Sequence, residues 1–151
     1  MTSGNGVFAC DNTWDESGVQ FYFQPDGVEE VVALDMVSVP GGNAYSAIGE
    51  YDGFIHENAV DIPEQYKPNI GSTSAIAYCP SDPKVMARVG EHEAKGYYSL
   101  DGGKTWEDLK VPNGGGKMAI TQLDEKNYRF IKASGDNAAI SYTDDFGATW
   151  E

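Results

Sequence analysis

The densest group of chemically capable side chains is the run Glu50-Tyr51-Asp52-Gly53-Phe54-Ile55-His56, which combines carboxylates, a phenol and an imidazole. Charges and a glycine interrupt the alternation of apolar and polar residues that a half-buried strand would show. We therefore predict that this run is a loop reaching a cleft, where Tyr51, Asp52 and His56 are candidate ligand contacts. The alternative is a turn at the edge of a sheet, in which Phe54 belongs to the core and His56 is only hydrogen-bonded.

Other chemically capable residues lack the partners that catalysis requires. His56 and His92 lie far apart, and neither has a serine or cysteine in a motif beside it, so a catalytic triad has no support. The glycine-rich run at 113–116 precedes Lys117-Met118, whereas a phosphate-binding loop needs Lys-Ser or Lys-Thr opening a helix. We expect residues 113–116 to connect two structural units, without a role in phosphate binding.

One eight-residue pattern occurs twice, at residues 99–106 and 143–150. Both copies read Ser/Thr-x-Asp-x-Gly-x-Thr-Trp, and their spacing of about 44 residues matches one four-stranded blade of a β-propeller. The aspartate is expected to accept backbone N–H bonds across a tight turn, the glycine to supply a positive φ, and the hydroxyl to cap a free backbone group. We expect the tryptophan to begin the next strand and to pack between blades. The residues assigned to these turns are Ser99, Asp101, Gly103, Thr105, Trp106, Thr143, Asp145, Gly147, Thr149 and Trp150.

Short β-rich runs precede the two turns, at 74–78, 85–89, 96–99, 118–123, 128–133 and 138–143. Farther upstream, 28–39 and 45–55 are expected to be strands of another blade. The stretch 29–36 also fits a short helix, because Glu, Ala, Leu and Met favour one, but its β-branched residues favour the strand. Residues 6–11 and 19–23 are expected to form the last hairpin of an earlier blade.

These runs predict an all-β fold, a β-propeller fragment of about three four-stranded antiparallel blades plus a hairpin. The expected units are the end of a blade at 1–27, blades at 28–68 and 69–112, and a truncated blade at 113–151.

Composition excludes several function classes. The chain has 151 residues, with 24 Asp and Glu against 10 Lys and Arg, and a formal net charge of −14. Such a surface repels phosphate backbones and anionic lipids, so neither nucleic acid nor a membrane is an expected partner. No signal peptide is predicted within these residues. Cys10 and Cys79 fit two buried thiols or a single bridge and are not spaced as metal ligands, so no metal or cofactor is expected.

The chain also resembles known families. The two repeat turns resemble the Asp-box of sialidase-type and related β-propellers, which joins the third strand of a blade to the fourth. Five segments resemble, in order, glycoside hydrolase family 74: residues 3–12, 27–40, 45–56, 71–77 and 85–90. This second resemblance implies two seven-bladed propellers with a cleft between them, extracellular location and inverting cleavage of β-1,4-glucan backbones such as xyloglucan. The chain would belong to the second propeller, with the rest of that propeller and a polysaccharide as its partners.

The family resemblance also bears on the site. Inversion needs two carboxyl groups about 6.5–9.5 Å apart, and the family takes one from each propeller. Both catalytic residues are expected outside residues 1–151, so the chain alone should be inactive. Glu50 stands where the family usually has Asp, and Asp52 replaces a small residue. Sugar rings stack on aromatic faces and bind planar polar groups. The expected substrate contacts are Tyr51, Asp52 and His56, followed by Trp14 and Tyr66.

Two other functions compete with this one. A sialidase-type propeller would need a cluster of arginines to hold the sugar carboxylate, but the chain has only Arg88 and Arg129, and Arg88 fits a strand. A non-catalytic binding or assembly module, similar to sortilin-like receptors or photosystem assembly factors, is compatible with the repeat turns. It would not explain the family-74 resemblance of residues 27–77.

Overall fold

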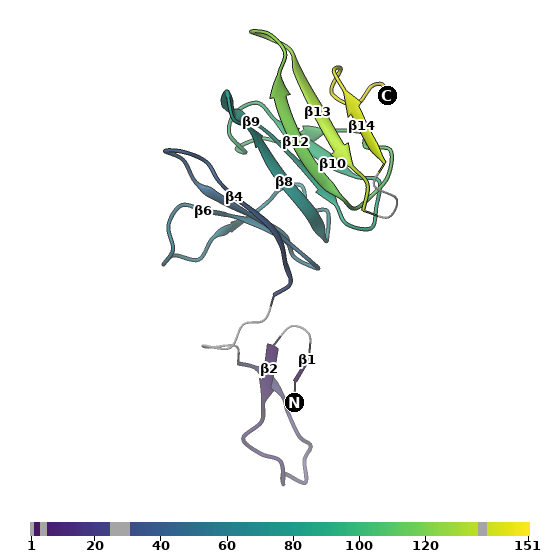
Figure 1. The fold of residues 1–151 in the computed structure, drawn as a ribbon. Coiled ribbons are helices and arrows are strands. Elements are labelled where there is room, and N and C mark those ends of the chain that lie inside the picture. Colours follow the sequence, from purple (N-terminus) through teal and green to yellow (C-terminus); the bar gives the residue numbers. More distant parts are fainter. Residues whose placement is uncertain (1, 4–5, 25–30, 136–138) are drawn as a thin grey trace. The chain divides into compact units, whose positions relative to one another are not determined.

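The structure is a computed structural model that describes residues 2–3, 6–24, 31–135 and 139–151 (Figure 1). It divides into two compact units, Met1–Val32 and Ala33–Glu151. Every regular element among the described residues is a β-strand, so the predicted all-β class is confirmed.

The first unit contains a three-stranded antiparallel sheet in the order β1-β2-β3. Its strands are β1 (Thr2–Ser3), β2 (Gly6–Ala9) and β3 (Tyr22–Phe23). Phe8 and Phe23 form a cross-strand pair with ring centroids 5.3 Å apart. The predicted two-stranded hairpin was therefore incomplete, because β1 adds a third strand and β3 is shorter than the run 19–23.

The second unit contains three antiparallel sheets, in the strand orders β4-β5-β6-β7, β11-β10-β9-β8 and β12-β13-β14. The first sheet comprises β4 (Ala33–Ser38), β5 (Ala44–Ile48), β6 (Asp52–His56) and β7 (Glu64–Gln65). The second comprises β8 (Thr73–Cys79), β9 (Asp82–Gly90), β10 (Gly96–Ser99) and β11 (Glu107–Asp108). The third comprises β12 (Lys117–Gln122), β13 (Tyr128–Ala133) and β14 (Ile140–Thr143).

Of two local predictions that carried an alternative, one is confirmed and one is wrong. The strand favoured over a helix for 29–36 forms from Ala33 onward, because β4 pairs along β5 and this pairing outweighs helix propensity. Residues 28–30 and 138 lie outside the described residues. The run 50–56 is not a cleft loop, because Asp52–His56 form β6, paired with both β5 and β7. Only Gly49–Tyr51 remain as a turn between β5 and β6.

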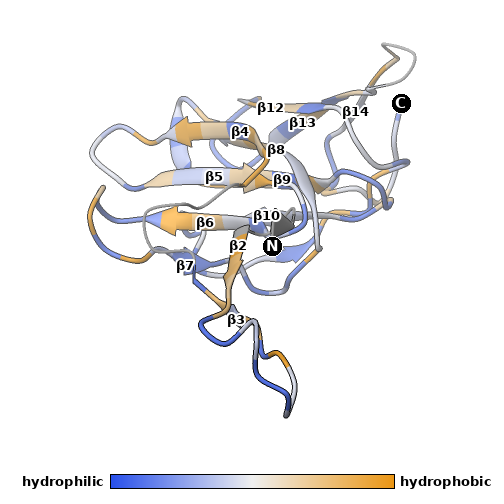
Figure 2. Cartoon of the chain, turned by 90° about the horizontal axis from the view of Figure 1, so that it is seen from below, coloured by the Kyte–Doolittle hydropathy of each residue, from blue (hydrophilic) through white to orange (hydrophobic). Residues whose placement is uncertain are grey.

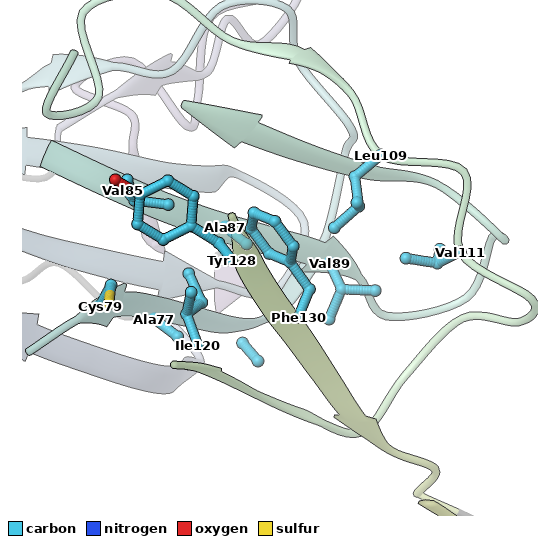
Figure 3. Packing of buried hydrophobic residues seen from close by; sticks show 11 residues of the cluster. Ala77, Cys79, Val85, Ala87, Val89, Leu109, Val111, Ile120, Tyr128 and Phe130 are labelled. Carbon is cyan, nitrogen blue, oxygen red and sulfur yellow. The ribbon is translucent and has the colours of Figure 1, made fainter. Parts of the chain in front are cut away.

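The sheets pack face to face through alternating residues. On β8, Ala75 and Ala77 face the third sheet, whereas Ile76 lies in the cluster shared with the first sheet. Figure 3 shows Tyr128 and Phe130 of β13 against the valines of β9. Apolar stretches lie within strands such as β4, β5 and β6, and the connections are mostly polar (Figure 2). Successive side chains of a strand point to opposite faces of the sheet, so a sheet between two others can be buried on both faces.

The first strands of the three sheets, β4, β8 and β12, pack beside one another. A parallel bridge between Asp52 and Ser72 shows that β6 and β8 start at the same end, and antiparallel pairing puts the start of β4 there too. The Gly115 N–H donates to the Gly90 carbonyl oxygen (2.8 Å), which adds the start of β12. We call this the first-strand end. The repeat turns follow β10 and β14, so they lie at the opposite end.

Candidate functional site

A cleft of about 850 Å³ opens at the first-strand end of the second unit. Its lining comes from the first strands, from the loops after β9 and β13, and from the connection before β12. These residues are Leu34, Ser74, Glu91, His92, Asn113, Gly114, Gly115, Gly116, Lys117, Ser134 and Gly135. Most of them are polar or are glycines that expose the backbone. The cleft therefore offers hydrogen-bond donors and acceptors rather than an apolar wall.

Lys117 ties the three first strands together at the cleft. Its Nζ donates to the carbonyl oxygens of Leu34 (3.0 Å) and Ser74 (3.3 Å) and forms an ion pair with Asp35 at 3.2 Å. Leu34 and Asp35 belong to β4, Ser74 belongs to β8, and Lys117 begins β12. One ammonium thus connects all three sheets.

A buried lysine of β13 anchors the connection 113–116 to the interior of the protein. Lys132 on β13 is 1% exposed, and its Nζ donates to Asn113 Oδ1 at 2.5 Å. Burial lowers the pKa of this amine. Gly116 packs so closely that an added Cβ would lie 1.9 Å from the Ala133 carbonyl oxygen. The contacts with Lys132 and Ala133 of β13 therefore fix the cleft wall formed by residues 113–116.

The turn between β5 and β6 also lies at the first-strand end, and two residues in or next to it have positive φ values. Glu50 and Asp52 have φ values of 68° and 64°, in the left-handed region of backbone conformation that residues other than glycine rarely occupy. The Glu50 N–H donates to Ser72 Oγ at 2.6 Å, and the Tyr51 carbonyl oxygen accepts from Gln65 Nε2 at 2.8 Å. Glu50 is exposed, so this turn presents a free carboxylate at the first-strand end.

Asp52 lies in the interior and not at a ligand-facing surface. Its residue is 0% exposed, and Arg88 Nη1 donates to Oδ1 at 2.6 Å and to Oδ2 at 2.7 Å. Thr73 Oγ1 donates to Oδ1 (2.5 Å) and the Ile70 N–H to Oδ2 (2.8 Å). Both carboxylate oxygens are therefore engaged, and we withdraw Asp52 as a substrate contact. A residue expected to bind sugar instead binds the neighbouring sheet.

Arg88, the partner of Asp52, is stacked among aromatic rings. Its guanidinium carbon lies 4.8 Å from the ring centroids of Tyr66 and Tyr97 and 4.9 Å from that of Trp106. Burial lowers the pKa of Arg88, and the adjacent Asp52 carboxylate opposes this shift. Tyr66, a predicted sugar contact, is only 1% exposed and forms part of this core.

The structure does not bring the three predicted contacts together. Tyr51 lies at the first-strand end, whereas β6 carries His56 toward the opposite end, roughly 16 Å away at the rise of an extended strand. His56 Nε2 and Ser46 Oγ are hydrogen-bonded at 2.9 Å, as the alternative for this run anticipated. Trp14 is 95% exposed and belongs to the first unit. Among the predicted sugar contacts of the second unit, only Tyr51 lies at the first-strand end, where the cleft opens.

Known proteins share this sequence and fold. No protein-family model matches the chain. A xyloglucanase of Acetivibrio thermocellus is 32% identical over 99% of the chain. The crystal structure of a GH74 enzyme of Niastella koreensis superposes with a TM-score of 0.73 at 28% identity, over 99% of this chain and 21% of that one. A GH74 xyloglucanase of Xanthomonas campestris gives 0.71 at 30% identity, over 97% and 22%.

The chain belongs to glycoside hydrolase family 74. It spans about a fifth of the length of these relatives, 19% in the case of the Acetivibrio enzyme. The predicted propeller architecture and the predicted family are both confirmed.

In this family-74 chain the two repeat turns are built alike. Asp101 Oδ1 accepts the backbone N–H of Thr105 and Asp145 Oδ1 that of Thr149, both at 2.9 Å. Ser99 Oγ and Thr143 Oγ1 each accept a glycine N–H at 2.9 Å. Those glycines, Gly103 and Gly147, have φ values of 79° and 89°. Trp106 packs against the core shared with the first sheet, and Trp150 against that between the second and third.

Hydrogen bonds also shift the acidity of the two turn aspartates. Partial burial raises the pKa of Asp101, but hydrogen bonds from Thr105, Ser99 and Lys104 outweigh it and lower the pKa to about 2. Hydrogen bonds from Thr149 and Thr143 likewise lower the pKa of Asp145 to about 2. These carboxylates are committed to holding the turns.

Several other features were found only in the structure or settled by it. Sequence reasoning missed Lys117, Asn113 and Lys132, because the signal that joins them is their convergence from separate parts of the chain.

Both cysteines are free thiols, with Cys79 buried and Cys10 half-buried. Within the described ranges, no group of three or more His, Cys, Asp or Glu side chains could hold a metal ion. The same residues include no helix that is long and apolar enough to span a membrane.

Proposed function

We propose that this chain forms one wall of the substrate cleft of an enzyme that hydrolyses xyloglucan or a similar β-1,4-glucan, and that Glu50 is the carboxylate it contributes to the chemistry. The substrate class rests on the names of its relatives, several of which are xyloglucanases. A polymer of this kind is degraded outside the cell, so we also propose that the protein is extracellular.

The observation that supports Glu50 is its backbone. A non-glycine residue at φ 68° carries strain, and such strain concentrates where a structure must hold a side chain in a functional position. Glu50 combines this strain with an exposed side chain at the end of the sheets where the cleft opens. This proposal revises the expectation that both catalytic carboxylates lie outside residues 1–151.

Inverting hydrolysis needs one carboxyl group as acid and another as base, about 6.5–9.5 Å apart. Asp52 is unsuited to be the second, because Arg88 holds both of its oxygens. The resemblance to family 74 supplies the second from the opposing propeller. Within this chain, the side-chain amide of Asn113 and the backbone around Gly114 can donate to sugar hydroxyls, and Tyr51 is the predicted stacking platform.

The test is Glu50→Gln in the full-length protein, assayed by release of reducing sugar from xyloglucan. Loss of a general acid or base should lower kcat about 10²- to 10⁴-fold while the melting curve stays unchanged. Glu50→Asp should lose less activity than Glu50→Gln, because it keeps a carboxylate even though that group is displaced by one methylene. The matched control is Glu57→Gln, an exposed carboxylate just beyond the far end of β6. Full activity in Glu50→Gln would refute the assignment, and a parent protein that releases no sugar would favour a binding module.

A further inference from the structure

The turn that carries Glu50 is fastened to the connection before β8 by backbone-directed contacts. The Glu50 N–H donates to Ser72 Oγ (2.6 Å), and the Asp52 N–H donates to the Gly71 carbonyl oxygen (2.8 Å). A parallel bridge joins Asp52 to Ser72. The positive φ values of Glu50 and Asp52 persist because these contacts hold the turn from the neighbouring sheet.

One carboxylate organises the receiving segment. Asp52 accepts the N–H of Ile70 and the hydroxyl of Thr73, the residues on either side of Gly71-Ser72. Its partner Arg88 donates from Nη2 to the Pro68 carbonyl oxygen at 2.5 Å. The Asp52 carboxylate therefore fixes both ends of the short segment to which the Glu50 turn is attached.

Stability alone is a poor explanation for this pair. Both side chains are 0% exposed, and a buried ion pair can often be replaced by apolar side chains without loss of stability. What an apolar pair would lack is the set of directed bonds to residues 68–73. What distinguishes this pair from an apolar one is therefore the set of bonds that it directs to the segment holding the turn.

We infer that Asp52 and Arg88 are positioning residues that hold the Glu50 carboxylate in its working orientation through residues 68–73. This inference rests on the proposed role of Glu50. It assigns to Asp52, buried within the sheets, an effect on catalysis that it exerts without touching substrate.

The first experiment compares Asp52→Asn with Asp144→Asn in the full-length protein. Asp144 forms the chain's other aspartate–arginine pair in the described residues, a two-bonded contact with Arg129 (2.8 and 2.7 Å), but this pair is 40% and 34% exposed. Asp52→Asn should lower kcat on xyloglucan about 10- to 100-fold with KM changed less than twofold, since small misplacements of a reacting group have effects of this size. Asp144→Asn should leave both unchanged. Wild-type kcat in Asp52→Asn would overturn the inference.

Two further variants separate positioning from folding. Asp52→Asn combined with Arg88→Met removes both charges, so its melting temperature should recover relative to Asp52→Asn while kcat stays low. Recovery of kcat together with the melting temperature would mean that the pair is only structural. Ser72→Ala removes the acceptor for the Glu50 N–H but leaves the ion pair intact, and it should also lower kcat more than KM.

A mutant cycle connects the effect to Glu50. If Asp52 acts through Glu50, Asp52→Asn should not reduce the residual kcat of Glu50→Gln any further. An equal reduction in both backgrounds would overturn the inference and leave the role of Glu50 standing. If Glu50→Gln is fully active, the proposed function fails at its own experiment, before the cycle is interpreted.

Discussion

Gly102 and Gly103, adjacent in the first repeat turn, allow two physical effects to be measured separately. Their φ values are nearly equal, 75° and 79°. A Cβ added at Gly102 meets nothing within 4 Å, whereas one at Gly103 lies 2.9 Å from Tyr45 Cε1. Tyr45 cannot easily give way, because it is 4% exposed and its hydroxyl donates to the Gly102 carbonyl oxygen at 2.8 Å. Alanine at either position has the same backbone strain, but only at Gly103 does its Cβ also clash with the Tyr45 ring.

The expected magnitudes follow from these contacts. A left-handed conformation costs an L-residue roughly 1–2 kcal/mol, partly offset by about 0.4–1 kcal/mol from the reduced freedom of the unfolded chain. Gly102→Ala should therefore destabilise the fold by about 1 kcal/mol or less. Overpacking adds about 1–3 kcal/mol, so Gly103→Ala should cost about 1–4 kcal/mol, and more than Gly102→Ala.

The assay is urea unfolding of both variants in the full-length protein, followed by tryptophan fluorescence and analysed for the midpoint and the slope. Trp106 lies in the same turn and packs against the same core as Tyr45, so its emission reports on the region. Equal destabilisation by the two alanines would show that backbone strain alone sets the cost. A larger loss at Gly102 would contradict the packing around Tyr45.

Two other predictions concern acid stability and the core. The folded-state pKa of Asp145, about 2, lies below its ordinary 3.8, so the unfolded chain binds more protons at acid pH. Its contribution should be complete above about pH 4 and disappear as the pH falls toward 2, and melting temperatures of Asp145→Asn should show a smaller acid dependence than wild type. Phe130 is fully buried against Tyr98 and Phe146, so Phe130→Ala should lower the free energy of unfolding by about 3–5 kcal/mol in urea titrations, and Phe130→Leu clearly less.

The repeat turns were predictable because their information is local. Each places its hydroxyl, carboxylate and glycine within eight residues, and the bonds they make stay inside that window. The strands beside them were found for a similar reason, since burial alternates along β13 with the period of two that a strand imposes. Local rules predict local structure well.

The site was harder to predict because its contacts are distant in sequence. Asp52 resembled a surface residue until Arg88, 36 positions away, proved to be its buried partner. The interruption of alternation in residues 50–56 predicts a loop, but it instead reflects positive φ values at Glu50 and Asp52, around the start of β6. The cleft itself is assembled from five separate stretches of chain, and no single one carries a motif.

In each repeat turn the hydroxyl and the carboxylate bond only to groups of the same turn, and this affects which parts of the fold can change. Because each turn closes its end of a sheet without help from the other end, residues inserted after β9 or before β12 would leave that closure intact. The loops at the first-strand end can therefore be lengthened, shortened or replaced while the same blades are kept. One anchored end makes the other free to diversify.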